Sequence, residues 1–351
     1  MPKYFRHNIV AMTGYVPGEQ PGNDGVVKLN TNENPYGPSP KVYATLKRAL
    51  NSSLRLYPEP QSDTLRTAAA RLYGVKPGNI IVGNGSDEIL SMLLRCFVGP
   101  GDRVAYPVPT YSLYDTLVEI QDGSKVAVNY PANFSLPAEL AEQNAALTFV
   151  CNPNAPSGTL IALPAIEKLA RSVSGILAVD EAYVDFAATE GASAIPLIRQ
   201  LPNLVVLRTF SKSFSLAGMR IGLAFAAEEI IAGMMKVKDS YNVNRLSLLA
   251  ATAALEDLPW MTRNVQRIQR SRKKLTAGLK RLGYQVYPSQ ANFVLARKDG
   301  ENMKSIYEEL KRRKIFVRYF DFPVLQDCLR ISVGTPSEIN ILLKEMARLT
   351  Q

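Results

Sequence analysis

A lysine set among hydroxyl groups is the residue of this chain best placed for covalent chemistry. Lys212 follows the apolar run Leu204–Leu207, which is short and β-branched enough to be a buried parallel strand. Thr209 and Ser211 precede it closely, and Arg220 comes eight residues later. A lysine amine forms a Schiff base with an aldehyde, while hydroxyl groups and a guanidinium hold a phosphate. The pattern therefore predicts a site for a phosphorylated aldehyde.

The elements that must position this lysine repeat the order of apolar strand, special loop and helix from Ile80 onward. This βαβ order predicts a mainly parallel sheet, in which ligands bind beyond the carboxyl ends of the strands. The first such loop holds Gly85, Ser86 and Asp87. Glycine lets the backbone approach a ligand closely, and the free amides of the helix that follows can cradle a phosphate.

Three later strand ends add an aromatic ring, a polar loop and a carboxylate. Tyr111 follows a proline-stiffened turn and can stack on a flat cofactor ring, although ordinary packing explains it equally well. The loop 152–158 is polar and proline-rich. Asp180 ends an apolar strand, so burial should require a partner such as a protonated pyridine nitrogen. Tyr183, three residues later, can return to the same site.

Length and composition indicate an ordinary globular protein. The chain has 351 residues, of which 46% are hydrophobic and 21% are charged, so we expect one large α/β domain with a smaller one beside it. We find no long apolar span and no apolar leader, which predicts a cytoplasmic protein without a membrane segment. Cys96, Cys151 and Cys328 lie far apart, which predicts reduced thiols and no metal site.

Basic residues are concentrated in one stretch, although the net charge of +10 is spread more widely. Between Arg263 and Arg281, with Arg272 among them, apolar residues recur at helical spacing. The basic residues are therefore interpreted as the solvated face of an amphipathic helix rather than a nucleic-acid site. Arg318 and Arg330 differ, because they lie in expected strands, and arginine is suited to bidentate capture of phosphate or carboxylate.

The chain divides into three expected parts. Residues 1–40 are rich in Gly, Pro and Asn and predict an extended arm. The polar stretch Asn30–Pro35 within it should line a cleft or wrap a neighbouring chain. Residues 41–255 are expected to form the large domain. Residues 256–351 are expected to form a small α+β domain, because strands there alternate with fewer helices.

The order and spacing of these motifs resemble the fold-type I aminotransferases, which use pyridoxal 5'-phosphate (PLP), and within them the histidinol-phosphate branch. The resemblance covers nearly the whole chain. It rests on Asn30–Pro35, Tyr57-Pro58, Gly85–Glu88, Pro109–Tyr111, Asp180–Tyr183, Arg208–Lys212, Ala217–Arg220 and Cys328–Gly334. It implies a PLP-dependent transferase fold, with a mainly parallel seven-stranded sheet flanked by helices and a small α+β C-terminal domain.

The resemblance also implies a role for each matching residue. Lys212 would join the cofactor as an imine and move the proton, Asp180 would pair with the pyridinium nitrogen, and Tyr183 would reach O3' of the ring. Further cofactor contacts are implied for Gly85, Ser86, Asp87, Tyr111, Ser211 and Arg220, and for Tyr57 from the other subunit of a homodimer with shared sites. Contacts to the substrate's phosphate or carboxylate are implied for Tyr15, Asn32, Arg318 and Arg330.

One position departs from the family pattern. Relatives usually read Asn-Pro-Thr-Gly where this chain has Ala155-Pro156-Ser157-Gly158, and that asparagine would donate a hydrogen bond to O3'. Three replacements are open, namely Asn154, a water molecule, or Tyr183 acting alone. We expect a higher imine pKa here than in relatives that keep the asparagine.

The resemblance implies a ping-pong transaminase of histidine biosynthesis. It would convert histidinol phosphate and 2-oxoglutarate into imidazole-acetol phosphate and glutamate. A threonine-phosphate decarboxylase and a broad aromatic aminotransferase stay as alternatives, because Arg318 and Arg330 recognise negative charge rather than an imidazole. A PLP-dependent regulator is disfavoured, since it would need an attached DNA-binding domain and none precedes Asn30.

Overall fold

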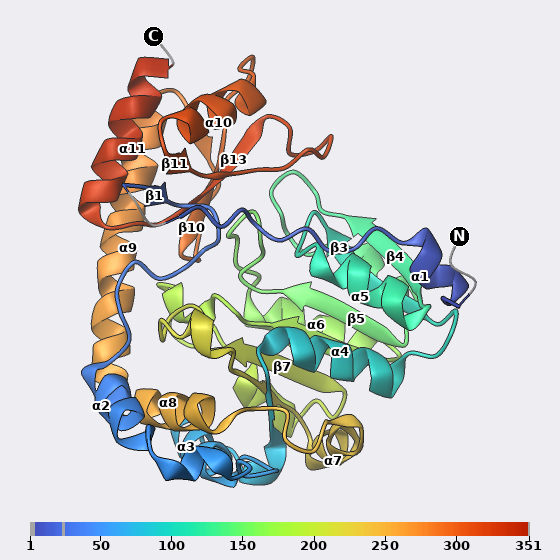
Figure 1. The fold of residues 1–351 in the computed structure, drawn as a ribbon. Coiled ribbons are helices and arrows are strands. Elements are labelled where there is room, and N and C mark those ends of the chain that lie inside the picture. Colours follow the sequence, from blue (N-terminus) through green and yellow to red (C-terminus); the bar gives the residue numbers. More distant parts are fainter. Residues whose placement is uncertain (1–3, 23–24, 350–351) are drawn as a thin grey trace.

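A seven-stranded sheet forms the centre of the larger part of the molecule (Figure 1). The computed structural model describes residues 4–22 and 25–349. The strands lie in the order β2-β8-β7-β6-β5-β3-β4. Their bounds are β2 (Ile80–Gly83), β3 (Arg103–Val108), β4 (Ser124–Asn129), β5 (Leu147–Cys151), β6 (Ile176–Asp180), β7 (Leu204–Thr209) and β8 (Gly222–Phe225). All neighbours pair in parallel except β8, which is antiparallel to β2 and β7. The expected mainly parallel sheet is thus confirmed.

Helices cover both faces of this sheet, so its central strands are apolar on both sides. Val205 and Leu207 of β7 pack into one core, while Leu204 and Val206 pack into the other. The first core contains residues of α4 (Ser86–Phe97), α5 (Leu113–Gln121) and α7 (Glu228–Val237). The second contains residues of α2 (Pro40–Ala49), α3 (Asp63–Tyr73), α6 (Leu163–Ser172) and α8 (Arg245–Leu255). This double burial explains the continuous apolar runs of the sequence.

A second sheet, of four antiparallel strands, lies in the C-terminal part of the chain. Its order is β12-β13-β10-β9. The strands are β9 (Gln285–Val286), β10 (Phe293–Arg297), β12 (Arg318–Tyr319) and β13 (Cys328–Ser332). The helices of this part are α9 (Leu258–Arg281), α10 (Met303–Arg312) and α11 (Pro336–Leu349). Figure 1 shows α9 running along the side of the molecule from the α2 region to α11.

The basic helix α9 is amphipathic as expected, with one exception. Ile268 and Leu275 are fully buried while Arg263 and Lys274 are exposed. Arg272, however, was expected on the solvated face and is buried at 7% exposure. Its Nη1 donates to the carbonyls of Phe186, at 3.0 Å, and Ala291, at 2.7 Å. That side chain therefore ties α9 to the segment after β6 and to the loop before β10, which helical periodicity alone could not reveal.

The N-terminal arm carries two short elements that the sequence did not predict. Helix α1 (His7–Ala11) lies beside α5, where Asn8 donates to the carbonyl of Glu119 at 2.7 Å. Strand β1 (Val27–Lys28) pairs in parallel with β11 (Ile315–Phe316). Figure 1 shows the arm crossing the molecule between the two sheets. Elements of two and five residues are too short to give a periodic signal.

Two further expectations concern the cysteines and the membrane. Cys96, Cys151 and Cys328 are all free thiols; the last two are buried and Cys96 is half-buried. In residues 4–22 and 25–349, no helix is both long enough and apolar enough to cross a membrane. The same residues contain no group of three or more His, Cys, Asp or Glu side chains that could hold a metal ion.

Gly175 lies just before β6, and its packing against the chain before β5 can be tested by substitution. A Cβ atom there would overlap the backbone carbonyls of Ala145 and Ala146, which cannot move aside easily. We expect Gly175→Ala to lower the free energy of unfolding by about 1–3 kcal/mol. The measurement is urea denaturation of the cofactor-free protein, followed by circular dichroism.

Gly233 of α7 is the matched control, because a Cβ there meets no atom within 4 Å. Gly233→Ala should raise the free energy of unfolding by about 0.5–1 kcal/mol, since alanine is the better helix former. Equal unfolding curves for Gly175→Ala and the parent protein would contradict the packing described here.

Candidate active site

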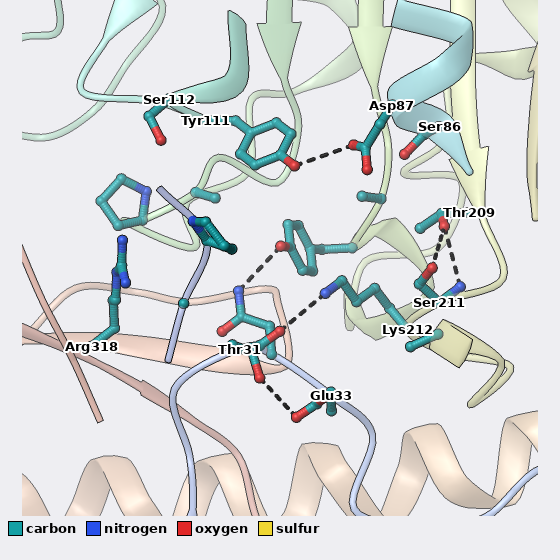
Figure 2. Close-up of a pocket in the computed structure, with 18 of the residues that line it drawn as sticks. Thr31, Glu33, Ser86, Asp87, Tyr111, Ser112, Thr209, Ser211, Lys212 and Arg318 are labelled. Carbon is teal, nitrogen blue, oxygen red and sulfur yellow. Dashed lines mark hydrogen bonds between the residues drawn. The ribbon is translucent and has the colours of Figure 1, made fainter. Parts of the chain in front are cut away.

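A cavity of about 290 Å³ lies at the carboxyl ends of the strands of the large sheet. The N-terminal arm and the small sheet also contribute lining residues. The cavity is lined by twelve of the residues that the sequence suggested, namely Tyr15, Asn32, Ser86, Asp87, Tyr111, Asp180, Tyr183, Ser211, Lys212, Arg220, Arg318 and Arg330. Figure 2 shows Lys212 entering it between Ser86 and Thr31, with Arg318 on the other side. The structure therefore brings groups from distant parts of the chain to one place.

Two of the suggested residues do not line the cavity. Gly85 lies behind it, in contact with Arg220, where an added Cβ would come within 2.6 Å of the guanidinium. Tyr57 is 76% exposed and stacks on Tyr241, with 4.4 Å between the ring centroids. Within this single chain, Tyr57 therefore takes no part in the cavity.

Lys212 presents its amine to the cavity from the loop after β7. The side-chain amide of Asn34 donates to the backbone carbonyl of Lys212 at 3.1 Å, which helps to fix the loop. The lysine Nζ donates to the carbonyl of Thr31 at 3.3 Å. Burial lowers the pKa of Lys212 to about 8, and the positive charge of Arg330 acts in the same direction. About a tenth of the amine is thus neutral and nucleophilic at pH 7, far more than for an ordinary lysine.

Asp180 places a buried carboxylate at the end of β6. Burial raises its pKa to about 6, and hydrogen bonds from Tyr114 and the Ala182 amide, each at 3.1 Å, oppose that rise. Across the described part of the chain, Asp180 forms no ion pair. Burying a carboxylate costs free energy unless a cation meets it, so the site suits a ligand with a protonated ring nitrogen.

A cradle for a phosphate lies at the start of α4. The helix begins after Gly85, whose φ is +83°, and no side chain caps its first turn. The backbone of Gly222 closes against this turn, because a Cβ at Gly222 would overlap the amide of Ser86. Ser211 accepts hydrogen bonds from Thr209, at 3.0 Å, and from Arg220, at 3.4 Å. Free amides, hydroxyl groups and a guanidinium together match a phosphate group.

Two tyrosines, Tyr111 and Tyr183, also line the cavity. Tyr111 donates to the Asp87 carboxylate at 3.2 Å and packs edge-on against Tyr114. The oxygen of Tyr183 accepts a hydrogen bond from the Asn32 amide at 3.1 Å, and its ring packs edge-on against Phe293. Each ring is therefore held by an aromatic side chain outside the cavity lining and by a hydrogen bond to another lining residue.

The structure reduces the options for replacing the missing asparagine at position 155. Ala155 lines the cavity, whereas the Asn154 side chain is buried elsewhere. The Asn154 oxygen accepts from Thr110 at 2.9 Å. Its amide donates to the Pro109 carbonyl, at 3.2 Å, and to Ser157, at 2.9 Å. Asn154 is therefore occupied and cannot serve as the replacement.

Arg318 and Arg330 form a pair of positive charges at the opposite wall. They are direct partners in the register of β12 and β13, and both guanidiniums lie over the ring of Phe320. Arg330 donates to the carbonyl of Asn30 at 2.9 Å, and burial lowers its pKa. Neither arginine forms an ion pair with a described carboxylate. This wall is therefore suited to bind an anion.

Three residues that support the site were missed in the sequence. Tyr114, which donates to Asp180, lies one helical turn after Tyr111, so its spacing was a usable signal. Thr31 holds the lysine amine through a backbone carbonyl, which no side-chain pattern reveals. Position 222 requires glycine, because its backbone lies against the Ser86 amide. This close approach depends on how β8 pairs with β2.

The neutral amine, the buried carboxylate and the phosphate cradle suit an enzyme that binds a phosphorylated aldehyde. The chain belongs to the class I and II aminotransferase family, whose sequence model matches residues 24–346.

Similar curated proteins have a narrower name. Histidinol-phosphate aminotransferase 1 of Trichormus variabilis is 44% identical over 99% of each chain. The histidinol-phosphate aminotransferase of Syntrophotalea carbinolica is 46% identical over 98% of each chain. Among solved structures, histidinol-phosphate aminotransferase from Sinorhizobium meliloti in complex with pyridoxal-5'-phosphate covers 99% of each chain, with a TM-score of 0.90 and 26% identity.

The lowered pKa of Lys212 can be measured in the cofactor-free protein. An amine-selective acylating reagent attacks only the neutral amine, so its rate at Lys212 should rise through a midpoint near pH 8. Peptide mass mapping of the labelled protein follows this rate. The control is the same lysine in urea, where the midpoint should return to the ordinary lysine value of about 10.4. A native midpoint equal to the denatured one would contradict the described environment.

Proposed function

We propose that this aminotransferase is a PLP-dependent histidinol-phosphate aminotransferase of histidine biosynthesis, with 2-oxoglutarate as the amino acceptor. One observation carries the chemistry, namely that Lys212 and Asp180 line the same cavity. Full-length relatives at 44% and 46% identity that bear this name support the choice of substrate.

The residues around the cavity fit PLP. The amides of Ser86 and Asp87, with Ser211 and Arg220, would hold its phosphate. Asp180 would meet the ring nitrogen, Tyr111 would lie against the ring and Tyr183 would reach the ring hydroxyl. When bound, PLP supplies an electron sink for the carbon that carries the amino group. Asp180 forms no ion pair within the described residues, and Gly85 offers no side-chain cap to α4, and both observations support this assignment.

The chain's own residues supply binding and proton transfer. The neutral amine of Lys212 takes the proton from Cα of the amino donor, because burial keeps its pKa close to the working pH. Arg318 and Arg330 hold the phosphate of histidinol phosphate in one half-reaction and a carboxylate of 2-oxoglutarate in the other. Both substrates can therefore use one anion-binding wall in turn.

Replacement of Lys212 tests this role. We expect Lys212→Ala to bind PLP but to lower kcat for glutamate formation by about 100-fold or more, because no other lysine of the described residues lines the cavity. Lys236→Ala, an exposed lysine of α7, is the control and should keep the parent rate. Residual transamination within about tenfold of the parent would refute the assignment.

Two alternatives use the same wall, since paired arginines recognise charge and not an imidazole. A threonine-phosphate decarboxylase would release carbon dioxide, whereas the proposed enzyme forms glutamate only when 2-oxoglutarate is present. A broad aromatic aminotransferase would show similar kcat/KM for phenylalanine and histidinol phosphate. Half-reaction absorbance with a panel of amino donors distinguishes the three, and a preference for threonine phosphate or phenylalanine would overturn the proposed substrate.

We also propose that the active protein is a homodimer with shared sites. Exposed apolar side chains are concentrated around residues 50–57, where Leu50, Leu54, Leu56 and Tyr57 are between 48% and 76% exposed. Such a surface suits a second copy of the chain. Tyr57 would then reach the PLP phosphate of the partner's cavity.

Mixed dimers test the shared site. Tyr57→Ala and Lys212→Ala each damage every site of their own homodimer. In a mixed dimer one site would carry both changes and the other neither. A statistical mixture should therefore recover about a quarter of the parent activity, since half of the dimers hold one intact site. No recovery after verified subunit exchange would contradict a shared site.

The division of the chain and its location stay proposals as well. We propose an arm of residues 1–40, a large domain of residues 41–255 and a small domain of residues 256–351. The cavity takes Tyr15, Lys212 and Arg318 from these three parts, which supports the division. Free thiols support a cytoplasmic location, where cysteines are kept reduced.

A further inference from the structure

The oxygen of Tyr183 accepts a hydrogen bond from another residue of the chain. To contact the ring hydroxyl of PLP, as proposed above, Tyr183 would act as a hydrogen-bond donor. The group that donates to the Tyr183 oxygen is Nδ2 of Asn32, 3.1 Å away. Asn32 is 1% exposed, so water does not compete for its amide. The direction of this hydrogen bond depends on which end of the Asn32 amide faces Tyr183.

Ser332 holds Asn32 through two hydrogen bonds. The serine Oγ accepts the backbone N–H of Asn32 at 2.9 Å and donates to Asn32 Oδ1 at 3.0 Å. A hydroxyl group has a single hydrogen, so this hydrogen is used on Oδ1. If the amide turned over, its NH₂ group would donate to the second lone pair of the serine Oγ, and Tyr183 would donate its hydrogen to Oδ1. In the structure the NH₂ group faces Tyr183, and only this orientation leaves the Tyr183 hydrogen for the cavity.

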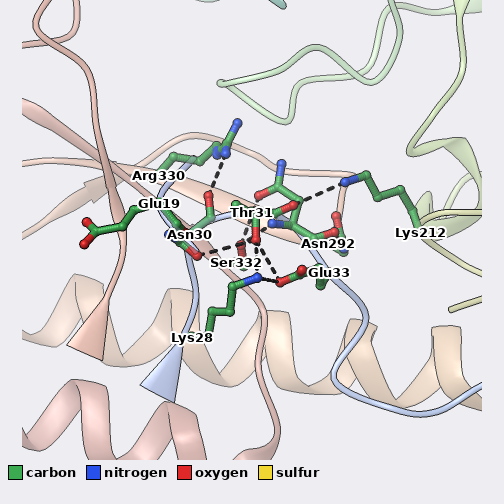
Figure 3. A network of polar contacts seen from close by, with 10 residues as sticks. Glu19, Lys28, Asn30, Thr31, Glu33, Lys212, Asn292, Arg330 and Ser332 are labelled. Carbon is green, nitrogen blue, oxygen red and sulfur yellow. Dashed lines mark hydrogen bonds and ion pairs between the residues drawn. The ribbon is translucent and has the colours of Figure 1, made fainter. Parts of the chain in front are cut away.

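The backbone of Asn32 is held as firmly as its side chain. Its φ of +56° lies in the left-handed region, which asparagine tolerates better than most residues. Its carbonyl accepts a hydrogen bond from Asn292 at 2.9 Å. Figure 3 shows Asn292 and Ser332 beside the arm. Residues of the small sheet and the loop before β10 thus place the arm residue that contacts Tyr183.

The hydrogen of the Tyr183 hydroxyl is consequently left for the cavity. Its oxygen already accepts from Asn32, and it donates to no group among the described residues. Burial raises the pKa of Tyr183, and the positive charge of Arg330 and the Asn32 hydrogen bond only partly offset this effect. Cys151 and Asp180 raise the pKa further, while the Lys212 amine lies 5.6 Å from the ring centroid. The phenol therefore keeps its proton at neutral pH.

We propose that Asn32, held by Ser332, is a positioning residue that makes Tyr183 the hydrogen-bond donor to the cofactor's ring hydroxyl, in place of the side chain that Ala155 lacks. The proposal rests on PLP binding as proposed above, and it deepens that function. In this proposal Asn32 positions Tyr183, whereas the sequence suggested that Asn32 contacts the substrate.

An absorbance titration of the PLP-loaded protein without substrate tests the proposal. A hydrogen bond to the ring oxygen stabilises its negative charge, so weakening that bond raises the pKa of the bound cofactor. We expect Asn32→Ala to raise it by about one unit. Asn32→Asp should raise it more, because a carboxylate would accept the Tyr183 hydrogen and withdraw it from the cavity.

The double variant shows whether Asn32 acts through Tyr183. Asn32→Ala should cause no further shift in a Tyr183→Phe background, since the donor is already gone. Ser332→Ala keeps Asn32 but releases its amide, and it should produce a smaller shift in the same direction. Asn264→Ala is the matched control, because Asn264 is a buried asparagine of α9 that does not line the cavity and whose amide donates to the Gly37 carbonyl at 3.4 Å; its cofactor pKa should stay unchanged.

Two results would overturn the proposal. The first is a cofactor pKa in Asn32→Ala equal to that of the parent, with lower thermal stability as its sole effect. The second is a shift that adds fully to that of Tyr183→Phe, because Asn32 would then act independently. If the parent chain bound no PLP and gave no cofactor absorbance, the proposed function itself would fail, and the parent spectrum alone distinguishes that case.

Discussion

The structure depends on one constraint, which is that an amine and a carboxylate are buried around the same cavity without forming an ion pair. Burial moves both toward their neutral forms, lowering the pKa of Lys212 to about 8 and raising that of Asp180 to about 6. Each charge is unfavourable in the cofactor-free protein. A ligand that offers an aldehyde to the amine and a cationic ring nitrogen to the carboxylate relieves both costs.

Three consecutive residues of the arm connect the two sheets across this cavity. The carbonyl of Asn30 accepts from Arg330, the carbonyl of Thr31 accepts from Lys212, and the amide of Asn32 donates to Tyr183. Figure 3 shows the first two of these contacts side by side. The arm therefore sets the positions of the anion-binding wall, the reactive amine and the phenol relative to one another.

The sequence predicted the parts of the site that follow directly from strand ends. Lys212 and Asp180 could be placed because each ends a continuous apolar run, and such runs are typical of strands covered on both faces. The mainly parallel sheet followed from the order of apolar strand, loop and helix, and the number of seven strands followed from the family resemblance. The antiparallel strand β8 could not be predicted from this order, because only a short 3-10 turn, Ala217–Met219, and no α-helix, connects β7 to Gly222–Phe225.

Contacts between distant segments could not be predicted in this way. Arg272 is a charged residue of an amphipathic helix, and such residues are usually exposed. Its side chain is nevertheless buried, because it donates hydrogen bonds to the carbonyls of Phe186 and Ala291. Asn154 looked like a replacement for the missing asparagine, but its amide points to Pro109 and Ser157. The direction of a single side chain depends on packing partners that local sequence does not specify.

The most direct measurement asks which amine an aldehyde cofactor reaches. The purified protein would be incubated with PLP, reduced with borohydride, digested and mapped by mass spectrometry. The account predicts one modified peptide, carrying the pyridoxyl phosphate mass on Lys212. Modification of another lysine while Lys212 stayed unlabelled would contradict the central claim.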